Sequence, residues 1–194
     1  MHTTEFELLE TLSQPVCPVC TLARREARTY LVGVFEDGIN DPAVRDDWRA
    51  RGGLCARHWR EVREFDSVLL PATILLRDLL GSYLDHPSPV WKMPDCPACK
   101  REAEAEVRHF KALLGIPEAT MLKALEDGPG FLCLRHLVQM PPGTLRNRFE
   151  SRLISFLPEL DELERKQDYR FSKEPLGNEK DSWLRAMRAL GGEV

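Results

Sequence analysis

Four short motifs hold the residues that could carry out chemistry. Two are Cys-Pro-x-Cys, at residues 17–20 and 96–99, and two are Cys-x-x-His, at residues 55–58 and 133–136. Side chains three positions apart lie on one face of a helix, so each motif can present two ligand atoms to a single ion. Three cysteines and one histidine are a common ligand set for a closed, tetrahedral zinc site.

The motifs occur in the same order in each half of the chain. The Cys-Pro-x-Cys motifs begin 79 residues apart and the Cys-x-x-His motifs 78 residues apart, which predicts a tandem duplication of one module. We expect a first module at residues 1–86 and a second at 87–194, packed as one globular unit. We also expect each module to bind its own ion, giving two zinc ions per chain. The predicted ligands are Cys17, Cys20, Cys55 and His58 in the first module and Cys96, Cys99, Cys133 and His136 in the second.

Other chemistry fits these motifs less well. Iron-sulfur ligation by three cysteines and one histidine is chemically possible, but closed sites of this composition are usually zinc sites. Dithiol oxidoreductases also use Cys-Pro-x-Cys, but between a strand and a helix, a context that this sequence lacks. A catalytic zinc keeps one position open for water, whereas each module supplies four ligands. Buried free thiols would not explain the repetition of the whole ligand set.

Arginine directly precedes the histidine in both Cys-x-x-His motifs, as Arg57 and Arg135. Three thiolates and one dication leave a charge of about −1, so either guanidinium could stabilise the site from outside the ligand shell. The alternative is that both arginines are surface residues pointing away from the metal. The remaining histidines, His2, His86 and His109, are expected to be ordinary surface residues.

The segments that must position these motifs read as helices, and strand signals are almost absent, so the sequence predicts an all-α fold. Asp41 followed by Pro42 predicts a helix start, and Gly52-Gly53 predicts its end. The densest apolar segment, 66–84, is expected to be the central core element, with 85–95 as a linker. Further helices are expected at 4–13, 21–36, from 55, at 98–114, in a short segment after 117, at 143–170 with a break at Pro158, and from 179 to about 190.

Composition excludes several classes of protein. The chain has 194 residues, 43% hydrophobic and 30% charged, which is typical of a folded globular protein. The net charge of −4 argues against an indiscriminate nucleic-acid binder, although Arg24, Arg25 and Arg28 could form a local basic patch. No segment predicts a signal peptide or a membrane span, so we expect a cytoplasmic protein. In that reducing compartment, cysteines favour metal over disulfides.

The C-terminal region contains three aromatic residues among many charges. Tyr169, Phe171 and Trp183 could fold back on the core or present a surface for a protein partner. Together, "CPVC", "NDPAVRDDWRARGGLCARH", "CPAC", "GFLCLRH" and "RKQDYRFSKEPLGNEKDSWLRAM" resemble a group of uncharacterised bacterial proteins of domain-of-unknown-function type. This resemblance covers most of the chain. It implies a bacterial cytoplasmic zinc-type protein and carries no known activity, substrate or catalytic residue.

The function that the sequence favours is that of a non-enzymatic binding or scaffold protein whose zinc ions are structural. One alternative is a zinc-thiolate redox sensor or metal sensor, in which oxidation of the Cys-Pro-x-Cys pairs expels zinc. A second alternative is a nucleic-acid-associated protein that acts through Arg24, Arg25 and Arg28.

Overall fold

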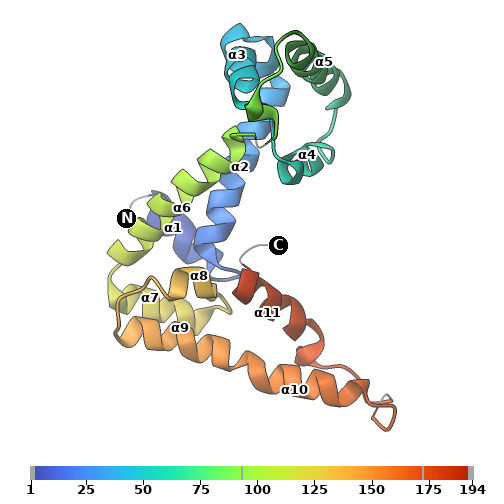
Figure 1. Cartoon of the computed structure of the whole chain (residues 1–194). Coiled ribbons are helices and arrows are strands. Elements are labelled where there is room, and N and C mark those ends of the chain that lie inside the picture. The colour runs from blue at the N-terminus through green and yellow to red at the C-terminus, as the bar shows by residue number, and fades with distance from the viewer. Residues whose placement is uncertain (1–2, 93, 172, 192–194) are drawn as a thin grey trace. The chain divides into compact units, whose positions relative to one another are not determined.

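Helices and turns make up the chain in the computed structural model, which describes residues 3–92, 94–171 and 173–191 (Figure 1). No strand occurs within those ranges. The predicted all-α fold is therefore confirmed. No helix in the described part of the chain is long and apolar enough to cross a membrane.

The two Cys-Pro-x-Cys motifs each start a long helix. α2 (Pro18–Glu36) and α6 (Pro97–Gly115) have 19 residues each and begin at the proline of the motif. The Cys17 carbonyl accepts a hydrogen bond from Thr21 N–H at 3.0 Å, and the Cys96 carbonyl accepts one from Lys100 N–H at 3.1 Å. Proline suits the first helical position because its missing N–H would have no partner there. Each motif thus places one cysteine before the helix and the other in its first turn.

The chain folds into two compact units. The first consists of Met1–Leu22 and Glu106–Val194, and the second of Ala23–Ala105. The chain therefore passes from one unit to the other within α2 and again within α6. The first unit contains, besides parts of these two helices, α1 (Thr3–Thr11), α7 (Glu118–Asp127), α8 (Leu134–Leu137), α9 (Thr144–Ile154), α10 (Phe156–Gln167), the 3₁₀-helix η3 (Asn178–Asp181) and α11 (Ser182–Gly191).

The core of the first unit brings α1 against the loop before α8. Gly130 N–H donates a hydrogen bond to the Leu12 carbonyl at 2.9 Å. A Cβ atom at Gly130 would lie 2.7 Å from Leu12 Cα, and one at Gly128 would lie 2.3 Å from the Leu12 carbonyl oxygen. Only glycine permits so close a backbone approach. This contact holds the segment that leads to Cys133 beside the segment that leads to Cys17.

Two expectations for the first unit are wrong. The 143–170 region breaks at Ser155, between α9 and α10, and Pro158 lies in the first turn of α10. A proline removes the hydrogen bond to the carbonyl four residues earlier, so the helix ends before it and restarts where the N–H is not needed. His109 is 5% exposed. It lies on α6 four residues from each of the buried residues Ala105 and Leu113, so this helix face points into the core.

The second unit contains the 3₁₀-helices η1 (Gly38–Asn40) and η2 (Pro89–Lys92), together with α3 (Pro42–Arg51), α4 (Ala56–Val62) and α5 (Leu69–Asp85). Asp41 caps α3 by accepting a hydrogen bond from Ala43 N–H, and Gly52 ends it with φ of 75°. Both predicted boundaries are confirmed. Trp48 fills the centre of this unit, makes an edge contact with Trp59 and donates a hydrogen bond from Nε1 to the Tyr30 hydroxyl at 2.9 Å.

α5 is not the central core element that its composition suggests. Leu75 and Leu79 are buried, but Leu69 and Leu84 are 81% and 74% exposed, and Leu80 is also exposed. The two buried leucines are four residues apart and form one stripe against a core already filled by aromatic side chains. His86, which follows α5, is exposed as expected, and His2 lies outside the described residues.

Candidate metal centres

All eight predicted ligand residues gather in two clusters, but the clusters join different motifs from those expected. The ligand atoms within each cluster lie within 4.8 Å of one another. The predicted division of the ligands into an N-terminal and a C-terminal set is wrong. The inner cluster consists of Cys55, His58, Cys96 and Cys99, and the outer cluster consists of Cys17, Cys20, Cys133 and His136.

The two pairs of motifs are thus nested along the chain. The outer cluster joins the first Cys-Pro-x-Cys to the last Cys-x-x-His, and the inner cluster joins the two motifs between them. Each cluster takes its thiol pair from one sequence repeat and its Cys-x-x-His from the other. The outer cluster lies within the first unit and the inner cluster within the second.

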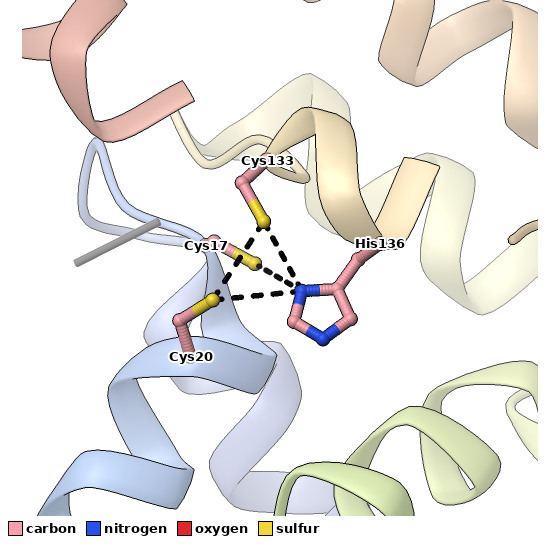
Figure 2. A group of neighbouring side chains, drawn as sticks. All are labelled: Cys17, Cys20, Cys133 and His136. Atoms are coloured by element: carbon pink, nitrogen blue, oxygen red, sulfur yellow. Dashed lines mark hydrogen bonds between the residues drawn. The ribbon is translucent and has the colours of Figure 1, made fainter. Parts of the chain in front are cut away.

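The outer cluster has the dimensions of a tetrahedral zinc site. His136 Nδ1 lies 3.5 Å from Cys17 Sγ, 3.5 Å from Cys20 Sγ and 3.2 Å from Cys133 Sγ (Figure 2). The sulfur atoms of Cys20 and Cys133 are 3.7 Å apart. Zinc bonds of about 2.3 Å to sulfur and about 2.1 Å to nitrogen in a tetrahedron imply separations of about 3.8 Å between sulfurs and about 3.6 Å from nitrogen to sulfur. The four ligand atoms therefore fit one zinc ion.

The inner cluster has nearly the same dimensions. His58 Nδ1 lies 3.3 Å from Cys55 Sγ, 3.3 Å from Cys96 Sγ and 3.4 Å from Cys99 Sγ. The sulfur atoms of Cys55 and Cys99 are 3.6 Å apart. This cluster can also hold one tetrahedral ion.

The Cys-x-x-His motifs are positioned by short helices. Cys55 precedes α4 and Cys133 precedes α8, and their carbonyls accept hydrogen bonds from Trp59 N–H at 3.0 Å and Leu137 N–H at 2.9 Å. The histidine then falls in the first turn, on the same side as the cysteine. Each cluster is consequently formed by two helix starts, where backbone N–H groups and the helix dipole favour negative sulfur.

Two glutamates that were not predicted to take part in metal binding lie behind the histidines. Nε2 of His136 is 2.8 Å from Glu106 Oε1, and Nε2 of His58 is 3.7 Å from Glu102 Oε2. A carboxylate beside Nε2 favours a proton on that nitrogen and leaves Nδ1 free to bind the ion. Both glutamates belong to α6. Glu102 follows Cys99 by three positions, which places both side chains on one helix face, and this spacing could have indicated the position of Glu102 beside the inner cluster.

The two arginines lie between these glutamates and the sulfurs. Arg57 forms an ion pair with Glu102, and its Nη2 is 4.0 Å from Cys99 Sγ. Arg135 lies 3.0 Å from Glu106, and its Nη2 is 3.8 Å from Cys20 Sγ. Both clusters therefore have the same arrangement of carboxylate and guanidinium.

Burial and thiol–thiol hydrogen bonds shift the pKa values of the cluster cysteines in opposite directions. Hydrogen bonds from the Cys17 and Cys20 thiols lower the pKa of Cys133 to about 3, while burial raises the pKa of Cys17. In the inner cluster, burial raises the pKa of Cys99 to about 12. Burial also lowers the pKa of His58, which keeps its ring in the neutral form that binds metal. Burial thus opposes ionisation of Cys17 and Cys99, and a dication beside them would offset that cost.

The remaining candidate residues are not members of either cluster. Arg28 lies 3.3 Å from Glu61 and stacks over Phe65, and Arg24 and Arg25 have interactions of their own. These contacts engage the side chains that were considered for a basic patch. In the C-terminal region, Tyr169 is 85% exposed and Trp183 is 49% exposed. Phe171 is partly buried, with the guanidinium groups of Arg165 and Arg170 over its ring.

Comparisons with known proteins give one similarity of note. No family model matches the chain, and no solved structure matches it. The chain is 28% identical to a protein of Caldicellulosiruptor sp. (strain Rt8B.4) named "Uncharacterized 23.9 kDa protein in xynA 3'region", across 84% of this chain and 88% of that protein. This similarity is consistent with a family of uncharacterised proteins.

Proposed function

We propose that this protein is a non-enzymatic zinc-binding protein of the bacterial cytoplasm, with two structural Cys3His sites. The observation that carries the proposal is the pair of complete four-ligand sets. Three thiols and one imidazole nitrogen, all within 4.8 Å of one another, fill a zinc tetrahedron in each cluster.

The ligand geometry supports a structural role over a catalytic one. A catalytic zinc keeps one coordination position open for water or substrate. Four protein ligands would instead fill all four positions of a tetrahedral ion. In addition, the Cys17 and Cys133 side chains belong to the main hydrophobic core of the first unit. An ion at this place would join core elements that lie far apart in the sequence.

A binding or scaffold role needs a partner surface, and we propose that the C-terminal region supplies it. Tyr169 and Trp183 are exposed, and aromatic residues are enriched at protein interfaces. Phe171 packs against Arg165 and Arg170, so it would act by shaping the region instead of contacting the partner. We propose a protein partner over a nucleic acid, because the arginines at positions 24, 25 and 28 are already engaged within the chain.

Metal analysis tests the central part of the proposal. Protein purified without a chelator or affinity tag should contain two zinc ions per chain, and removing them with a chelator should lower the helix content measured by circular dichroism. Iron with labile sulfide, or less than one metal ion per chain, would contradict the proposal.

A zinc-thiolate redox sensor is the second candidate function, and one observation favours it. Two of the six cysteines, Cys55 and Cys99, are partly exposed, and both belong to the inner cluster. Exposed thiolates are the ones that oxidants reach first. The structural role of the outer cluster is compatible with such a sensor.

A further inference from the structure

The two clusters share one geometric property that matters for oxidation. In each, the cysteine of the Cys-x-x-His motif has its sulfur close to the second cysteine of a Cys-Pro-x-Cys motif. The separation is 3.6 Å between Cys55 and Cys99 and 3.7 Å between Cys20 and Cys133. A disulfide needs sulfurs about 2.0 Å apart, so a small movement would join either pair. Proximity alone therefore does not distinguish the clusters.

Access from solvent does distinguish them. Cys20 and Cys133 are buried, and so is Cys17, the third thiol of the outer cluster. In the inner cluster Cys96 is buried, whereas Cys55 and Cys99 are partly exposed. The two partly exposed cysteines are thus also direct neighbours. A small polar oxidant reaches a thiolate far more easily at a partly open surface than in a core.

We propose that Cys55 and Cys99 are an oxidation-sensitive pair, which a peroxide converts to a disulfide with release of the inner-cluster ion while the outer cluster keeps its ion. This inference rests on the proposed function, because it requires both clusters to hold zinc. It adds to that function by assigning the two ions different roles, one exchangeable and one permanent.

The chemistry balances with hydrogen peroxide as the two-electron oxidant. One thiolate sulfur attacks a peroxide oxygen, the O–O bond breaks, hydroxide leaves, and a sulfenic acid forms. The neighbouring thiolate attacks the sulfenic sulfur, the S–O bond breaks, a second hydroxide leaves, and the S–S bond forms. The zinc ion loses two of its four ligands, and Cys96 with His58 is too small a set to retain it.

The disulfide would preserve the link that the ion provides. Cys55 lies at the start of α4 and Cys99 in the first turn of α6, and the S–S bond joins the same two segments. Because the disulfide keeps these segments joined beside the aromatic core around Trp48, we expect the second unit to keep its helices after oxidation. A thiol reductant with zinc should then restore the original state.

The test begins with the zinc-loaded wild-type chain, excess hydrogen peroxide and a chromophoric zinc indicator. We expect one equivalent of zinc to appear in a fast phase and the second at least about tenfold more slowly. Trypsin should yield residues 52–57 linked to residues 93–100, and fragment ions should assign the bond to Cys99 instead of Cys96. Helix content should be unchanged after the fast phase.

Two matched variants separate the pair from the rest of the cluster. Cys55→His keeps a four-ligand set without the reactive neighbour, so the fast phase should slow to the rate of the second phase. Cys133→His makes the same change in the outer cluster and should leave the fast phase unaltered. If either variant fails to hold metal, the disulfide mapped in the wild-type chain still shows which two cysteines react first.

Other outcomes would overturn the inference. Release of both equivalents at one rate, or a first disulfide between Cys20 and Cys133 or between Cys96 and Cys99, would show that access does not select the pair. If the chain holds two zinc ions before oxidation and then gives any of these results, the inference is wrong but the proposed function is not contradicted. A chain that binds no zinc before oxidation would instead overturn the proposed function itself.

Discussion

The sulfur atoms of Cys20 and Cys133 lie 3.7 Å apart although 113 positions separate the two residues in the sequence. In the inner cluster, the last ligand of the first motif is His58 and the first ligand of the second motif is Cys96, and these two residues are 38 positions apart. The entropy cost of closing a loop grows with the logarithm of its length, so closing the longer loop costs about 1 kcal/mol more. An ion in the outer cluster therefore restricts the unfolded chain more strongly than an ion in the inner cluster does.

The glutamates behind the histidines should affect the two sites unequally. Glu106 lies 2.8 Å from His136 Nε2, whereas Glu102 lies 3.7 Å from His58 Nε2. We expect Glu106→Gln to weaken zinc binding at the outer cluster by roughly 10- to 100-fold, and Glu102→Gln to have a smaller effect on the inner one. Competition with a chelator of known affinity measures both. The exposed Glu104→Gln is the control, and an equal loss for all three variants would contradict this assignment.

The close contact between the loop before Cys133 and α1 should make Gly130 intolerant of a side chain. A Cβ atom there would lie 2.7 Å from Leu12 Cα, which is backbone and cannot turn away. We expect Gly130→Ala to destabilise the first unit by about 1–3 kcal/mol in urea unfolding.

Gly33 within α2 provides the matched control, because nothing lies within 4 Å of a Cβ atom at that position. Gly33→Ala should stabilise the protein by about 0.4–1 kcal/mol, since alanine favours helix and restricts the unfolded chain. Equal effects of the two substitutions would show that the Gly130 backbone does not approach Leu12 closely enough to exclude a methyl group.

The ion pair between Lys166 and Glu179 should make the attachment of α11 depend on pH. Lys166 Nζ lies 2.7 Å from Glu179 Oε1, and its hydrogen bond lowers the pKa of Glu179 to about 2. The same hydrogen bond raises the pKa of Lys166. A lowered carboxyl pKa contributes stability above its unfolded value near 4.5, and this contribution disappears as the pH falls toward 2. A raised lysine pKa contributes stability below the unfolded value of about 10.5, and this contribution is lost as the pH rises above that value.

Hydrogen exchange of the α11 amides in the wild type and in Glu179→Gln measures this contribution. The wild type should be better protected than the variant at about pH 6, and the difference should shrink progressively below about pH 4.5. Lys166→Met should resemble Glu179→Gln at the higher pH. A difference at about pH 2.5 that is as large as the one at about pH 6, or no difference at about pH 6, would contradict the role of the pair.

Spacing and periodicity were enough to predict most of the helices and the eight residues that gather in the two clusters. α2 begins at Pro18, three residues before the predicted start at Thr21, because proline fits the first turn of a helix. Asp41 and Gly52 mark the two ends of α3 as predicted. The break near Pro158 was predicted three residues too late, since the chain accommodates proline by restarting the helix ahead of it.

The pairing of the motifs could not be derived from the sequence. The two Cys-x-x-His motifs are chemically equivalent, so either can complete either thiol pair, and loop entropy favours neighbours. The deciding contacts are tertiary, such as that of Gly130 with Leu12. The sequence also did not predict that most of α5 is exposed. An apolar helix has the same composition whether one stripe or its whole surface is buried, and only tertiary contacts decide between the two.

Zinc content of paired substitutions tests the nested pairing of the motifs most directly. Cys20→Ala with Cys133→Ala removes two ligands from one cluster and should leave one zinc ion per chain. Cys20→Ala with Cys55→Ala removes one ligand from each cluster and should leave no tightly bound zinc. If the N-terminal and C-terminal halves each bound their own ion, the first pair would abolish tight binding and the second would spare one ion. That result would contradict the nested pairing of the four motifs.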